Sequence, residues 1–250
     1  MSIKIVKIED QAKGAFDGMK ILENKPIGFP QDRGIQQPYS NLFYWANAWS
    51  YNGGLIDEHP HQMFEIMSFV IEGEIQHYDS KFNRWLSLKK GDAQIIRSGN
   101  GITHAEKIMA GGRMFQIWFD PNIQKSISKE ATYNDYGSAD MKCFEEGGIK
   151  IKNYIGNGGP VNMDAEGVEI NEYTIPKGNH QLKLNADKIH SFYLINGTVK
   201  IDGNKIKEND FFIFENEKEL NLEVETTTVL FTVAVPHKLT YKTYIELANS

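Results

Sequence analysis

Short β-rich runs separated by glycine turns dominate the first half of the chain. The run 66–72 ends at Gly73 and is followed by the alternating run 74–79, and similar short runs occur at 93–97 and 114–119. Strands of this length and spacing, without a convincing helical period, are typical of an antiparallel barrel or jelly roll. The pattern therefore predicts an all-β fold.

The second half of the chain repeats this rhythm. When the segment 191–201 is laid over 67–77, Gly197 falls on Gly73. A repeat of strands and turns predicts two similar barrels in one chain. The polar segment 122–148 is interpreted as their connection, with room for one short helix.

Three of the seven histidines lie in two short blocks, at His59 and His61 and at His104, where Glu106 follows two positions later. Successive side chains of a strand point to opposite faces, so the members of each block share a face. Two such strands facing each other across a barrel would bring four ligand atoms together. Three imidazoles and one carboxylate suit a divalent transition metal, with Fe(II), Mn, Ni, Cu and Zn all admissible. The remaining histidines are interpreted as structural: His77, His180, His190 and His237.

The second barrel lacks these ligands. The positions that correspond to His59, His61 and His104, counted from Gly197 and Asp210, are occupied by Lys183, Asn185 and Leu222. We therefore predict a metal-bearing domain at 1–130 and a domain without metal ligands at 131–250.

Composition sets the broad class of the protein. With 250 residues, 40% hydrophobic and 24% charged, the chain is an ordinary globular protein, and its net charge of −6 gives no electrostatic reason to bind nucleic acid. No apolar run resembles a signal peptide or is long enough to span a bilayer. The single cysteine, Cys143, allows no internal disulfide, which agrees with a reducing compartment. The chain is therefore expected in the cytoplasm.

The spacing of the histidine blocks resembles the two cupin motifs. The first motif is matched by a glycine, a His-x-His pair, a glutamate and a second glycine, at Gly53, His59, His61, Glu65 and Gly73. The second motif is matched by Gly91, Gly99 and His104. More narrowly, residues 40–120 resemble the pirin family, on the sequences of 59–65, 70–80, 91–94, 99–106 and 116–118.

The resemblance implies two cupin barrels, that is, jelly rolls or double-stranded β-helices, with one divalent metal ion in the first barrel. That metal is commonly iron, and the implied ligands are His59, His61, His104 and Glu106. Cupins at large use Glu65 instead, and strand parity permits either carboxylate. We take Glu106 as the ligand and Glu65 as a pocket carboxylate that orients a ligand histidine.

Bacterial pirin-like proteins are associated with quercetin 2,3-dioxygenase activity, so the resemblance implies O2-dependent opening of a flavonol or a similar enol. The expected proton acceptor is Glu106 or Glu65. Trp45, Phe64 and Phe69 would form a slot for a flat substrate, or simply pack in the core. Two alternatives stay open: an iron-binding regulatory module that contacts a protein partner, as in eukaryotic pirins, or a metal-dependent enzyme with another small substrate. A monomer is expected.

Overall fold

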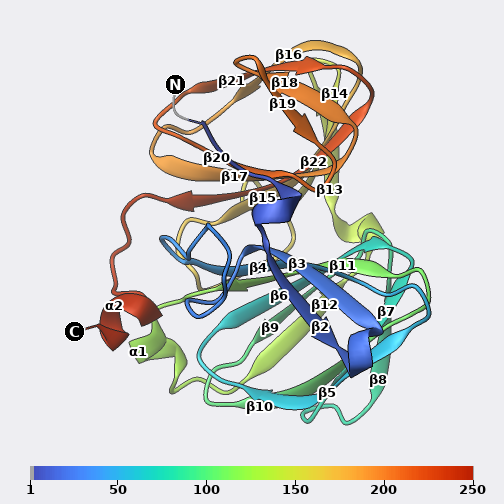
Figure 1. Cartoon of the computed structure of the whole chain (residues 1–250). Helices are drawn as coiled ribbons and strands as arrows, with labels where there is room; N and C mark the ends of the chain where they lie inside the picture. Colours follow the sequence, from blue (N-terminus) through green and yellow to red (C-terminus); the bar gives the residue numbers. More distant parts are fainter. Residues whose placement is uncertain (1–2, 250) are drawn as a thin grey trace. The chain divides into compact units, whose positions relative to one another are not determined.

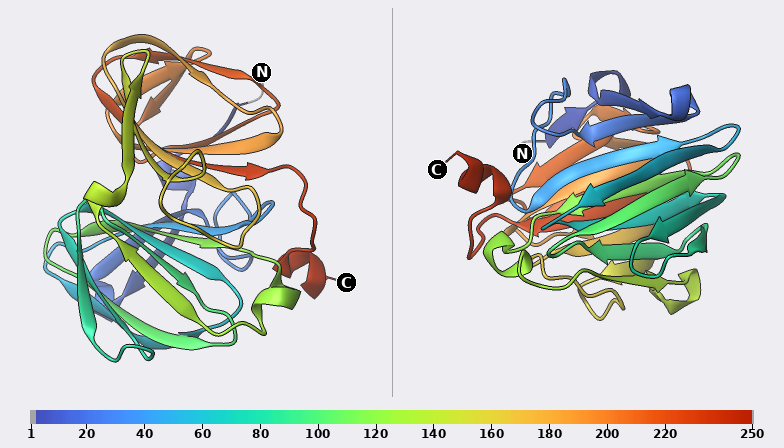
Figure 2. Two further views of the ribbon diagram at one scale, coloured as in Figure 1. Left: turned by 180° about the vertical axis from the view of Figure 1, so that it is seen from behind. Right: turned by 90° about the horizontal axis from the view of Figure 1, so that it is seen from below.

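Two compact units, which we call the N-terminal and C-terminal units, make up residues 3–249, the part of the chain that the computed structural model describes. Both are built almost entirely from antiparallel strands (Figures 1 and 2). The N-terminal unit comprises Gln11–Asp140, Met163–Glu166 and 239–249, and the C-terminal unit comprises 3–10, Met141–Asn162 and Gly167–Lys238.

The N-terminal unit contains a seven-stranded and a four-stranded sheet. The larger sheet has the order β12-β9-β6-β11-β4-β3-β2, with the bounds β2 (Ala12–Phe16), β3 (Ile21–Ile27), β4 (Leu42–Trp49), β6 (Glu65–Glu72), β9 (Ala93–Arg97), β11 (Arg113–Phe119) and β12 (Thr132–Tyr136). The smaller sheet has the order β5-β10-β7-β8, with β5 (Gly54–His61), β7 (Glu74–Asp79), β8 (Trp85–Lys89) and β10 (Ile102–Ile108).

The C-terminal unit has the same plan. Its larger sheet has the order β1-β20-β17-β22-β15-β14-β13, with β1 (Ile3–Val6), β13 (Lys142–Glu146), β14 (Ile149–Ile155), β15 (Glu169–Ile175), β17 (Lys188–Asn196), β20 (Phe211–Glu215) and β22 (Thr228–Pro236). Its smaller sheet has the order β16-β21-β18-β19, with β16 (Gly178–Lys183), β18 (Thr198–Ile201), β19 (Asn204–Lys207) and β21 (Glu219–Val224). In Figure 1 the two sheets of this unit form opposite walls of one barrel. The predicted all-β fold with two repeated barrels is confirmed.

The ends of the chain do not follow the predicted division at residue 130. Strand β1 pairs with β20 and so belongs to the C-terminal unit, whereas 239–249, including helix α2 (Tyr244–Ala248), belong to the N-terminal unit. Strand β12 lies beyond residue 130 and pairs with β9 of the N-terminal unit. The edge strand next to β9 in the N-terminal unit is thus β12, and the edge strand next to β20 in the C-terminal unit is β1. Both come from segments outside the repeated motif.

The polar segment 122–148 contains the predicted short helix, α1 (Ile123–Ser126), but it also contains β12 and β13. Both strands lie at sheet edges and most of their residues are exposed, so they lack the apolar alternation that identifies a half-buried strand. Within residues 3–249, no helix is long and apolar enough to cross a membrane.

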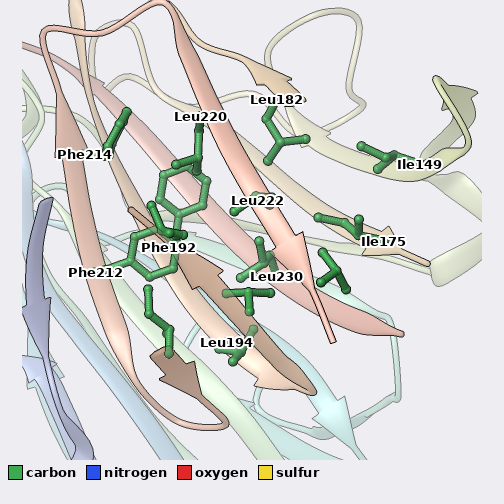
Figure 3. Packing of buried hydrophobic residues seen from close by; sticks show 14 of the residues in the cluster. Ile149, Ile175, Leu182, Phe192, Leu194, Phe212, Phe214, Leu220, Leu222 and Leu230 are labelled. Atoms are coloured by element: carbon green, nitrogen blue, oxygen red, sulfur yellow. The ribbon is translucent and has the colours of Figure 1, made fainter. Parts of the chain in front are cut away.

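Apolar side chains fill the interior of the C-terminal unit (Figure 3). The rings of Phe192 and Phe212 stack with centroids 4.7 Å apart, and Leu222 packs in the same cluster. Leu222 stands where the sequence repeat would place a metal-binding histidine. The interior of the N-terminal unit differs, because several inward positions carry polar residues.

Candidate metal centre

The pairing of β5 with β10 brings the three predicted histidines together. His59 lies opposite His104, and His61 lies opposite Ile102. Ile56 lies opposite Glu106. A bulge in β5 between Ile56 and His59 shifts the alternation of side chains by one position, so that His59 and His61 also point inward. The Nε2 atom of His104 is 2.8 Å from Nε2 of His61 and 3.1 Å from Nε2 of His59.

These three imidazoles are held in the form that binds a metal ion. The Nδ1 atom of His59 donates to the carbonyl oxygen of Asp57 at 2.7 Å, so the neutral ring has its lone pair on Nε2. Burial, followed by the neighbouring His59, lowers the pKa of His61 to about 3. Burial and the adjacent histidines hold the pKa of His104 well below its usual value. Three neutral nitrogens that converge on one point form a donor set for a divalent metal, so the residues fit the predicted centre.

Glu106 is fully buried and faces the same interior. Its Oε1 accepts a hydrogen bond from Ser68 Oγ at 3.2 Å, and its Oε2 accepts from Gln116 Nε2 at 2.6 Å. One donor atom each from Glu106, His104 and His77 lies within 4.8 Å of the other two. The predicted ligands therefore occupy one region, where His104 is shared between two sets of three residues.

Glu65 is not at this centre. Its two carboxylate oxygens accept hydrogen bonds from the backbone N–H groups of Asp164 and Ala165, each at 2.7 Å. Ser68 on the same strand reaches Glu106, and residues an odd number of positions apart on a strand point to opposite faces. The prediction that Glu65 orients a ligand histidine is therefore wrong. Burial raises the pKa of this carboxyl to about 7.

The aromatic neighbour of the histidines is Trp118, whose ring meets His61 edge to face with centroids 4.8 Å apart. The ring centroid of Phe64 lies 5.8 Å from that of Trp118. Trp45 and Phe69 occupy odd positions on β4 and β6, opposite in direction to Ser68, and are buried on the other face of the sheet. These two residues are therefore core residues and not part of a slot at the histidines.

The sequence interpretation missed His77. It lies opposite Glu106 on β7, and Asp79 lies opposite His104, so both side chains face the centre. The His77 Nε2 atom is 3.2 Å from Asp79 Oδ2, and both side chains are fully buried. The signal was present in the sequence, because His77 and Asp79 alternate on a predicted strand in the same manner as His59 and His61.

The fold and the histidines on β5 and β10 define a bicupin with a candidate metal centre in its N-terminal unit. Residues 39–119 match the family model described as Pirin, and the chain belongs to the pirin family. Pirin-1 of Arabidopsis thaliana is 30% identical over 177 residues, which is 68% of this chain and 53% of that protein. The quercetin 2,3-dioxygenase of Escherichia coli is 21% identical over 188 residues, 71% of this chain and 75% of that protein.

Among solved structures, the bacterial pirin YhhW from Escherichia coli, in complex with nickel(II), has a TM-score of 0.77 at 18% identity, covering 94% of this chain and 99% of that one. At this identity the likeness concerns the fold. The chain spans about half the length of the first curated relatives that it matches.

Proposed function

We propose that this protein is a metal-dependent dioxygenase of the quercetin 2,3-dioxygenase type, which uses O2 to open a flavonol or a similar enol. The observation that carries the proposal is the convergence of three Nε2 atoms from His59, His61 and His104. His59 and His61 are only partly buried, which supports access from solvent to the point where these nitrogens meet. The name of the Escherichia coli relative supports the reaction class.

The proposed ligands are His59, His61, His104 and Glu106, and the proposed metal is Fe(II). Mn, Ni, Cu and Zn suit the same set of three nitrogens and one carboxylate. A divalent metal ion with open coordination positions lowers the pKa of a bound hydroxyl group and polarises the substrate. Ser68 and Gln116 hold both oxygens of Glu106, which keeps this carboxylate in one orientation beside His104.

Glu106 is also the proposed acceptor for the hydroxyl proton of the substrate, because both oxygens of Glu65 accept backbone hydrogen bonds from Asp164 and Ala165 instead. Trp118, whose ring is perpendicular to that of His61, would give the substrate an apolar wall. Its Nε1 donates to Gln116 Oε1 at 3.3 Å, which ties the orientation of this wall to the residue that holds Glu106.

Elemental analysis of the purified protein, followed by O2 uptake with quercetin after anaerobic loading with Fe(II), tests the proposal. We expect about one metal ion per chain, and loss of both metal and O2 uptake in His61→Ala and Glu106→Ala. Glu65→Gln is the matched control and should keep both, since Glu65 faces away from the centre.

Metal binding without quercetin-dependent O2 uptake would contradict the dioxygenase and favour the regulatory module or another enolic substrate. A wild-type protein that takes up no metal under any loading condition would remove the metal centre itself.

A further inference from the structure

The face of β7 that lines the barrel interior contains a buried carboxylate–imidazole pair that the proposed metal site does not use. Pairing with β10 places His77 opposite Glu106 and Asp79 opposite His104. His77 and His104 have ring centroids 5.5 Å apart. Among the described residues, neither the Nδ1 atom of His77 nor that of His104 has a hydrogen-bond partner, although both are fully buried.

Asp79 determines which nitrogen of His77 carries the proton. Its Oδ1 accepts two backbone hydrogen bonds, from Lys81 N at 2.8 Å and Phe82 N at 2.9 Å. Its Oδ2 faces His77 Nε2 at 3.2 Å. Because a carboxylate only accepts, a neutral His77 ring carries its proton on Nε2 and offers Nδ1 as an acceptor.

His104 needs a hydrogen-bond acceptor at its Nδ1 when its Nε2 binds a metal ion. Its Nε2 points at His59 and His61, so a metal ion bound there takes the lone pair of Nε2. A neutral imidazole that ligates through Nε2 carries its proton on Nδ1, and a buried N–H group needs an acceptor. His77 is the candidate acceptor, since one donor atom of each ring lies within 4.8 Å of the other and the Nδ1 atoms of both rings lack a partner.

We propose that His77 and Asp79 are positioning residues for the metal centre: Asp79 fixes the tautomer of His77, and His77 accepts the Nδ1–H of His104 and so orients His104 Nε2 toward the metal ion. The inference rests on the proposed metal site. Outer partners of ligating histidines of this kind typically change metal affinity 10-fold to 100-fold when they are removed.

His77→Leu and His77→Asn test the acceptor with side chains of nearly the same shape. Only asparagine retains an acceptor oxygen close to the position of Nδ1. Calorimetric titration with Zn(II) should show affinity about 10-fold to 100-fold weaker than wild type for His77→Leu. His77→Asn should recover most of that loss. Equal affinity in wild type and His77→Leu would overturn the proposal.

Asp79→Asn tests the tautomer without a change of shape. Because two backbone N–H groups hold Oδ1, the new amide oxygen will occupy that position and the NH2 group will face His77 Nε2. His77 must then accept through Nε2 and carry its proton on Nδ1, toward the N–H of His104. We expect a loss of Zn(II) affinity comparable to that of His77→Leu.

The 15N NMR spectrum of the Zn(II)-loaded protein reads the tautomer directly. In the wild type, Nδ1 of His77 should give the signal of a bare ring nitrogen, and Nδ1 of His104 that of a protonated one. Asp79→Asn should move the proton of His77 to Nδ1. A protonated Nδ1 on wild-type His77 would contradict the proposal.

A second Zn(II) ion per chain, lost on His77→Leu, would also overturn it and make His77, His104 and Glu106 a second set of ligands. Absence of Zn(II) binding by the wild type would instead refute the metal centre on which both proposals depend. Unchanged binding by His77→Leu refutes only the role of His77.

Discussion

At the scale of single residues, buried carboxylates in the N-terminal unit differ in how their charge is stabilised. Glu106 has two hydrogen-bond donors, and Glu65 has two backbone N–H groups. Glu23 has weaker partners: the Tyr44 hydroxyl at 3.4 Å and the Lys25 ammonium at 3.8 Å. Burial raises the pKa of Glu23 from 4.5 to about 7, as it also raises that of Glu65, and the nearby negative charge of Glu106 acts in the same direction on Glu23.

Glu23 should make the stability of the protein depend on pH between about 4.5 and 7. In this window the unfolded chain releases the proton of Glu23 while the folded protein retains it, so the stability contributed by this group falls as pH rises. We expect Glu23→Gln to reduce the loss of thermal stability between pH 5 and pH 8, measured as Tm by circular dichroism.

Glu130→Gln is the control for this prediction. Hydrogen bonding and charge pairing with Lys81 lower the pKa of exposed Glu130 below 4.5. Its effect on the pH dependence of stability therefore falls at lower pH than that of Glu23. A Glu23→Gln variant whose Tm has the same pH dependence as wild type would show that Glu23 titrates at its ordinary value in the folded protein.

Residue types and alternation were sufficient to predict His59, His61 and His104 as one group, whereas Glu106 was chosen over Glu65 from the resemblance to the pirin family. The direction of the neighbouring residues could not be predicted. All residues of β6 except Glu72 are buried, so no polar face marks which side is the barrel interior. This is why Glu65 was assigned to the interior, and Phe69 to a slot or to the core, when both lie on the other face.

At the scale of secondary-structure elements, the tight turns between strands depend on glycines in the left-handed region. Gly197, between β17 and β18, has φ +98°, and a Cβ atom there would collide with the hydroxyl oxygen of buried Thr228. Gly203, between β18 and β19, has φ +79°, and no atom lies within 4 Å of its ideal Cβ position.

Gly197→Ala should therefore destabilise the protein more than Gly203→Ala. At Gly203 only the backbone conformation is unfavourable for alanine, at a cost of about 1–2 kcal/mol. At Gly197 steric overlap adds about 1–3 kcal/mol. Urea unfolding of both variants would measure the difference, and equal free energies of unfolding would show that Thr228 moves aside at no cost.

The strands that the sequence predicted best are those with apolar runs bounded by such turns, for example β9, which matches its predicted range 93–97. Strands β12 and β13 were missed because they are exposed edge strands without an apolar face. Their formation depends on pairing with β9 and β14, which no local pattern records.

At the scale of the whole molecule, one strand order occurs twice with two different interiors. The sequence repeat predicted the duplication, and the absence of ligands at Lys183, Asn185 and Leu222 predicted the difference. The exchange of chain ends between the units was not predictable, because β1 and 239–249 lie outside the repeat and join their units through contacts distant in sequence. The folded pairing of β1 with β20 spans more than 200 positions of the chain.

Metal binding should therefore be independent of the histidines in the C-terminal unit. His180 and His190 each face a backbone carbonyl oxygen at 2.9 Å, and Nδ1 of His237 lies 3.7 Å from a carboxylate oxygen of Glu215. The interior beside them is filled with apolar side chains, including Leu222. We expect the triple variant His180→Gln, His190→Gln, His237→Gln to retain one metal ion per chain by elemental analysis, whereas His61→Ala alone loses it. Reduced metal content in the triple variant, with its circular dichroism spectrum unchanged, would place ligands in the C-terminal unit and contradict the assignment of a single centre to β5 and β10.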